Sequence, residues 1–72
     1  MPKFAMYQTV RVTRVPSTPN TWPIPGVPLV GDTGAVIEIY LEPHEAYTVE
    51  SVASDGSANW LVDFLPDELE SV

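Results

Sequence analysis

Apolar and polar residues alternate most regularly between residues 31 and 41, and this stretch predicts the central strand of the protein. One face of the strand carries Ala35, Ile37, Ile39 and Leu41. The other face carries Val36, Glu38 and Tyr40. A period of two is typical of a half-buried strand. Gly31 and Gly34 stand just before it or at its start, and because glycine adopts positive φ angles at little steric cost, we expect both to form a tight turn that leads into the strand.

Three further stretches alternate in the same way and predict strands over 7–15, 47–53 and 58–65. The residues that share a face are Val10 and Val12 in the first, Tyr47, Val49 and Ser51 in the second, and Trp60, Val62 and Phe64 in the third. The last of these strands also has Leu61 and Leu65 on its opposite face, which indicates either burial on both sides or one face in the core and one in an interface.

Turn signals separate these strands. Asp55 and Gly56 form an Asp-Gly pair, which predicts a hairpin because both residues tolerate positive φ angles. Pro66, followed by Asp67 and Glu68, predicts a single helical turn, since proline suits the first helical position and acids suit the first turn. Leu69 to Val72 then form a short final strand or tail.

The connection over residues 16–30 is predicted to be a long loop, because its prolines cannot serve a central strand. They are Pro16, Pro19, Pro23, Pro25 and Pro28. We expect extended, polyproline-like backbone in this loop. Trp22 lies within it, and two interpretations stay open: the indole folds back as a lid on the sheet, or it projects and contacts a partner.

Four motifs follow one another in a fixed order along the chain. They are G-D-T-G-A-V at 31–36, Y-T-V-E at 47–50, D-G at 55–56 and F-L-P-D-E-L-E at 64–70. This order resembles a family of small bacterial proteins of unknown function with an SH3-like fold, a fold shared by the β subunit of nitrile hydratase. The resemblance covers the chain outside the proline-rich loop, and it implies a small all-β, five-stranded SH3-like barrel with one helical turn before the last strand. It implies no activity.

Composition limits the chain to one domain over residues 1–72 and leaves few options for stabilising it. There is no cysteine, so neither a disulfide nor a thiolate zinc site is available. No apolar run approaches the length of a membrane span, and the first residues lack the apolar segment of a signal peptide, so we expect a cytoplasmic protein. What remains for such a small core is an economical β fold, association with another chain, or both.

Charge is segregated along the sequence. The chain has a formal net charge of −7; its bases are Lys3, Arg11 and Arg14, and its acids all lie from Asp32 onward. Two interpretations of the acidic excess stay open: it keeps a small domain soluble, or it repels nucleic acid and attracts a basic surface. Either way, the balance of charge argues against binding to a phosphate backbone.

The motifs of known catalytic and cofactor sites are missing. The G-x-x-G turn lacks the lysine of a phosphate-binding loop. His44 is the one histidine, and no local spacing fixes a nucleophile or an acid beside it, so we expect a solvated turn residue. The acid pairs Asp63/Asp67 and Glu68/Glu70 lie where solvated carboxylates are expected. We therefore expect no catalytic residue, no metal site and no cofactor.

The sequence thus favours a non-enzymatic protein-interaction module that acts through a homo-oligomer or a partner protein, without nucleic acid or membrane. The expected contact residues are Trp22, Ile24, Val27, Leu61 and Leu65. Two alternatives remain. One is an accessory or activator subunit of a metalloenzyme such as nitrile hydratase, by analogy of fold. The other is an acidic inhibitor that occupies the cleft of a basic protein.

Overall fold

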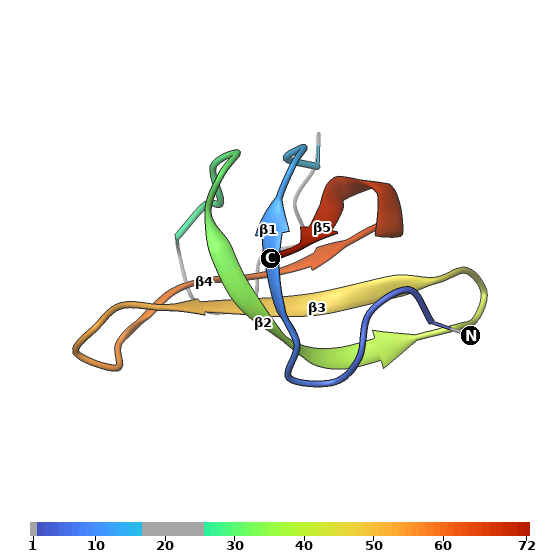
Figure 1. Ribbon diagram of the computed structural model, residues 1–72, viewed down its shortest axis with the longest axis horizontal. Helices are drawn as coiled ribbons and strands as arrows, with labels where there is room; N and C mark the ends of the chain where they lie inside the picture. Colours follow the sequence, from blue (N-terminus) through green and yellow to red (C-terminus); the bar gives the residue numbers. More distant parts are fainter. Residues whose placement is uncertain (1, 17–25) are drawn as a thin grey trace.

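The computed structural model describes residues 2–16 and 26–72, which form one antiparallel sheet (Figure 1). Its elements are β1 (Thr9–Val12), β2 (Thr33–Tyr40), β3 (Ala46–Val52), β4 (Ala58–Phe64), the 3-10 turn η1 (Pro66–Glu68) and β5 (Leu69–Ser71). The strand order is β4-β3-β2-β1-β5. An all-β fold with five strands and one helical turn before the last strand is therefore confirmed. The first strand is shorter than predicted at both ends, because Tyr7 belongs to a turn and the strand ends at Val12, before a bend at residues 13 and 14.

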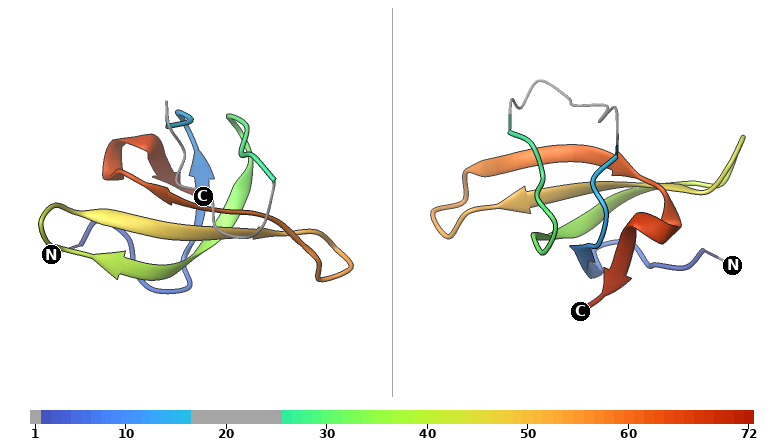
Figure 2. Two further views of the ribbon diagram at one scale, coloured as in Figure 1. Left: turned by 180° about the vertical axis from the view of Figure 1, so that it is seen from behind. Right: turned by 90° about the horizontal axis from the view of Figure 1, so that it is seen from above.

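The sheet is strongly bent. Figure 1 shows that β2 starts alongside β1, antiparallel to it, and then curves until it runs beside β3. The view from above in Figure 2 shows β1 and β5 next to each other on one side of the β3–β4 pair. The described strands do not close into a barrel, since β4 and β5 form the two edges of the sheet. Among the described residues, no helix is long and apolar enough to cross a bilayer.

A β-bulge in β2 explains why its predicted faces are wrong. Val36 pairs with Val49, but Glu38 pairs with Thr48, so Ile37 is an extra residue in β2. A bulge places two residues opposite one and reverses the alternation beyond it. In a regular strand, two residues that are three positions apart point to opposite faces. Because of the bulge, Val36 is fully buried and Ile39 nevertheless packs against the same core.

The inner face of the bent sheet holds the hydrophobic core. Its buried residues are Phe4, Val10, Val12, Val36, Tyr47, Val49, Trp60, Val62, Phe64 and Leu69. The predicted faces of β1, β3 and β4 are confirmed, including Ser51, which is buried opposite Trp60. Phe4 was not expected in the core. Its ring packs edge-on against Tyr47, with 5.1 Å between the ring centroids.

The two glycines before β2 have different roles. Gly31 has a φ angle of 96°, and its N–H donates to the carbonyl of Val12 (2.8 Å), as the predicted turn requires. Gly34 does not have a positive φ, so the prediction is wrong for this residue. Gly34 lies within β2, where its backbone passes close to Glu50 of β3 and leaves no space for a side chain.

Candidate functional site

The structure describes three of the five expected contact residues, and these three do not line one pocket. Trp22 and Ile24 lie outside the described residues. Val27 is 58% exposed and borders a polar pocket beside Trp60. Leu61 is half-buried and lines a groove on the outer face of the sheet, whereas Leu65 is exposed and lines a third hollow near η1. The three described residues therefore line three different pockets.

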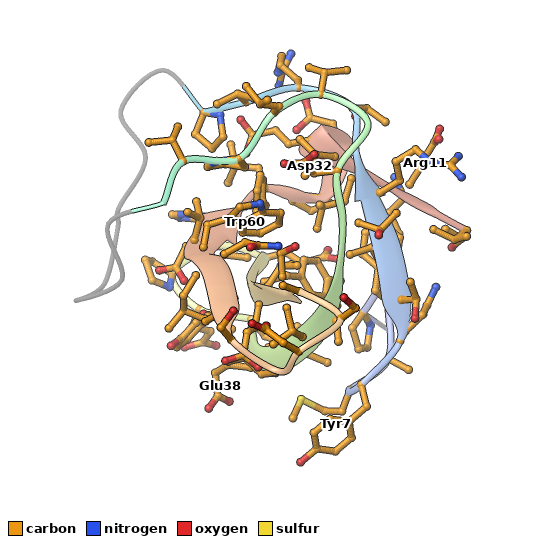
Figure 3. All side chains as sticks on the ribbon, turned by 90° about the vertical axis from the view of Figure 1, so that its left-hand side faces the viewer. Tyr7, Arg11, Asp32, Glu38 and Trp60 are labelled. Carbon is orange, nitrogen blue, oxygen red and sulfur yellow. The ribbon has the colours of Figure 1, made fainter. Side chains whose placement is uncertain are left out.

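The polar pocket beside Trp60 has a volume of about 460 Å³. One carboxylate oxygen of Asp32 accepts hydrogen bonds from the backbone N–H of Leu29 (3.0 Å) and from the indole Nε1–H of Trp60 (3.1 Å). Figure 3 shows Asp32 close to Trp60, above it and to its right in that view. Trp60 is only 2% exposed, so its ring forms part of the core rather than a surface for stacking a ligand. The role of Asp32 is therefore to hold the glycine turn against β4.

The hollow near η1 has a volume of about 420 Å³ and is bordered by His44, Asp63 and Glu68. Glu68 is 6% exposed, so its assignment to the solvated acids is wrong. Its Oε1 accepts a hydrogen bond from the backbone N–H of Leu65 (2.7 Å), which caps η1. Its Oε2 lies 3.9 Å from Nε of Arg14. Glu68 is thus a structural cap, and His44 is exposed as expected.

The outer-face groove lies on the side of the sheet away from the core and has a volume of about 230 Å³. Its lining residues are Ile37, Glu38, Tyr40, Thr48 and Leu61. Thr48 forms the floor, since it is 4% exposed and donates a hydrogen bond to Oδ1 of Asp63 (2.5 Å). The bulge contributes directly, because Ile37 is the residue that it adds to β2.

Glu38 lines this groove, and two further carboxylates lie beside it on the same face of the sheet. Thr48 pairs across the strands with Glu38 on one side and Asp63 on the other, and Glu50 pairs with Leu61. Paired residues of an antiparallel sheet point to the same face, so these acids share the outer face with Ile37 and Leu61. An apolar groove with an acidic border results.

The chain's own cations lie elsewhere. Arg11 pairs with Glu70 (2.9 Å), Arg14 pairs with Asp67 (2.9 Å), and Nζ of Lys3 donates to the carbonyl of Pro66 (3.1 Å). These are all the lysines and arginines of the sequence. Within the part of the chain that the structure describes, Glu38 and Glu50 consequently form no ion pair. Figure 3 shows Arg11 and Glu38 at opposite ends of the molecule.

An unusual turn precedes β1. The backbone N–H of Gln8 donates to the carbonyl of Ala5 (3.2 Å), and Tyr7 occupies the third position of this turn with a φ angle of 66°. Its side chain is 75% exposed, and that of Met6 is also exposed. The sequence pattern placed Tyr7 in a strand. A tyrosine gives no local signal for the left-handed conformation, so its position could not be read from the sequence.

The segment before the turn, residues 2–5, forms an N-terminal arm that is attached to the sheet through the hydroxyl of Tyr47. This hydroxyl donates to Glu45 and accepts hydrogen bonds from the backbone N–H groups of Lys3 (2.7 Å) and Phe4 (3.3 Å). The hydrogen bond from Tyr47, with another from the Lys3 backbone (3.0 Å), lowers the pKa of Glu45. Burial, followed by the hydrogen bond to Glu45, raises the pKa of Tyr47. The Tyr47 hydroxyl therefore fixes the arm, and its hydrogen-bonding groups are occupied by Lys3, Phe4 and Glu45.

In residues 2–16 and 26–72, no three acidic or histidine side chains are grouped so that they could hold a metal ion. Comparison with protein-family models, curated proteins and solved structures finds no match. The outer-face groove and the carboxylates beside it are the candidate functional site.

Proposed function

We propose that the protein is a non-enzymatic interaction module that binds a basic segment of another protein. The observation that carries this proposal is the apolar outer-face groove bordered by Glu38 and Glu50, which form no ion pair within the described part of the chain. An apolar surface with one sign of charge at its border favours a partner of the opposite sign. The alternative of an acidic inhibitor that occupies a basic cleft uses the same surface and is one form of this proposal.

Charge favours another protein over a second copy of the chain. If two copies met through this groove, the carboxylates of each would face those of the other, and like charges that are brought together oppose association. The net charge of −7 acts in the same direction. A homo-oligomer would therefore have to use a different surface.

We also propose that the fold is an SH3-like barrel, related to the small bacterial family and to the β subunit of nitrile hydratase. The order of the elements supports this, with five short strands and a 3-10 turn directly before the last one. The bend of β2 also supports an SH3-like fold, because it turns the β1–β5 pair across β3 and β4 (Figure 1). An accessory role beside a metalloenzyme would follow from this relation by analogy alone.

The experiment is a titration of the protein against a short fluorescein-labelled peptide of alternating lysine and leucine, read by fluorescence anisotropy. We expect binding that weakens as ionic strength rises from about 0.01 M to about 1 M, because the Debye length falls from about 30 Å to about 3 Å. A peptide of alternating glutamate and leucine is the control for apolar binding alone. Equal affinity for both peptides, or affinity independent of salt, contradicts the proposal.

Paired variants locate the site. The double variant Glu38→Gln, Glu50→Gln removes two charges at the groove. The matched control Glu42→Gln, Asp55→Asn removes two charges from the turns at the ends of β3, away from the groove lining. Exposed charge pairs contribute about 0.2–1 kcal/mol each, so we expect the groove variant to bind about two- to thirtyfold more weakly. An equal loss in the control would mean that net charge, and not the groove, binds the peptide.

A further inference from the structure

We propose that Tyr7, held in the left-handed conformation beside the bulge of β2, is the principal aromatic contact of the surface that receives the basic segment. This inference rests on the proposed function and extends the outer-face groove to the turn before β1. The whole docking surface then consists of Met6, Tyr7 and the groove.

Backbone hydrogen bonds place Tyr7 next to the groove. The N–H of Tyr7 donates to the carbonyl of Val36 (2.6 Å), and the N–H of Val36 donates to the carbonyl of Gln8 (3.0 Å). Tyr7 thus lies beside the point where β2 gains Ile37, and Ile37 lines the groove. Figure 3 shows that Tyr7 and Glu38 both project from the same, lower end of the molecule.

Folding alone gives no reason for a tyrosine at this position. Tyr7 is the third residue of a turn closed by Ala5 and Gln8, a position with positive φ that glycine or asparagine fills most easily. A bulky residue is strained in this conformation. Its ring is 75% exposed, so the strain is not balanced by extensive burial. A ring that contributes little to the core and is kept in a strained position is available for a partner.

The exposed tyrosine ring and the carboxylate of Glu38 favour a partner with apolar and basic side chains. A tyrosine ring contacts apolar side chains through its faces and also attracts a lysine or arginine placed over a face. Glu38 at the same end supplies a carboxylate for a second cation. The described structure offers no unengaged lysine or arginine of this chain to fill that role, so a second copy is a poor occupant. The occupant is a segment of another protein in which large apolar residues alternate with basic ones.

The test compares stability and binding in the same variants. Tyr7→Gly and Tyr7→Asn remove the ring and suit a positive φ, so their melting temperatures should be equal to or above that of the wild type. Both should bind the lysine–leucine peptide at least about tenfold more weakly, as expected for loss of an aromatic contact at the centre of an interface. Tyr7→Phe should bind nearly as well as the wild type. Val72→Ser is the control, since Val72 is also exposed and apolar but lies at the C-terminus.

The outcomes separate the two proposals. If the wild type does not bind the basic peptide, the proposed function fails. If it binds and the glycine and asparagine variants bind equally well, only the role of Tyr7 is wrong. If sedimentation shows a wild-type dimer that Tyr7→Gly disrupts, the occupant is a second copy and the inference of a basic partner is overturned.

Discussion

Substitution of Gly34 by alanine tests the packing between β2 and β3. A Cβ atom at this position would lie 2.7 Å from the carbonyl oxygen of Glu50 and 2.7 Å from Cγ1 of Val49. Ordinary contacts begin at 3.4 Å, so the methyl group would be about 0.7 Å too close to both atoms. The side chain of Val49 is fully buried and the oxygen of Glu50 belongs to a central strand, so neither can move without disturbing the core.

The cost follows from overpacking. Extra atoms in a packed site cost about 1–3 kcal/mol, and replacing glycine returns about 0.4–1 kcal/mol by restricting the unfolded chain. The midpoints of these two ranges, about 2 and about 0.7 kcal/mol, differ by about 1.3 kcal/mol, so we expect Gly34→Ala to lower the free energy of unfolding by about 1–2 kcal/mol. For a domain of this size this corresponds to a fall in melting temperature of about 4–16 °C. Thermal unfolding followed by circular dichroism measures it directly.

Gly31 provides the matched control. A Cβ atom there would contact nothing within 4 Å, but the φ angle of 96° strains any other residue. Gly31→Asn should restore most of the stability that Gly31→Ala loses, because asparagine tolerates positive φ. Gly34→Asn should remain as unstable as Gly34→Ala, since its problem is space. If Gly34→Ala melts at or above the wild-type temperature, the close approach of β2 and β3 is refuted.

Two further predictions concern carboxylates that hold the fold. Asp32→Ala removes the acceptor for Leu29 and Trp60, so it should lower the free energy of unfolding by about 2–4 kcal/mol, as measured by urea denaturation. Asp32→Asn should lower it less. An unchanged denaturation midpoint for Asp32→Ala would contradict this. The pKa of Glu45 is lowered by its hydrogen bond from Tyr47, so the stability that Glu45 provides is present above its ordinary pKa of 4.5 and is lost as pH falls through the lowered value. Melting temperatures measured between neutral and acid pH should therefore fall less steeply for Glu45→Gln than for the wild type, and parallel profiles would show that Glu45 makes no such contribution.

The existence of the strands and most of their faces could be predicted from the amino-acid pattern alone. Alternation depends only on the pleat of each strand, so Val10, Tyr47 and Trp60 could be assigned to the correct faces without knowledge of their partners. The Asp-Gly hairpin and the helical turn at Pro66 were equally predictable, because both depend on the local backbone preferences of a few residues.

Other features depend on contacts between segments that are distant in the sequence, and local patterns could not predict them. The bulge at Ile37 reversed the faces of β2, and the close approach of β3 gave Gly34 a packing role; both depend on which strand lies opposite. Glu68 was expected to be a surface acid, but it is buried and caps η1. Tyr7 is exposed in the turn before β1, in a backbone conformation that is unfavourable for a bulky residue. The outer-face groove combines residues from three strands, so it exists only in the folded sheet, where side chains distant in sequence share one face.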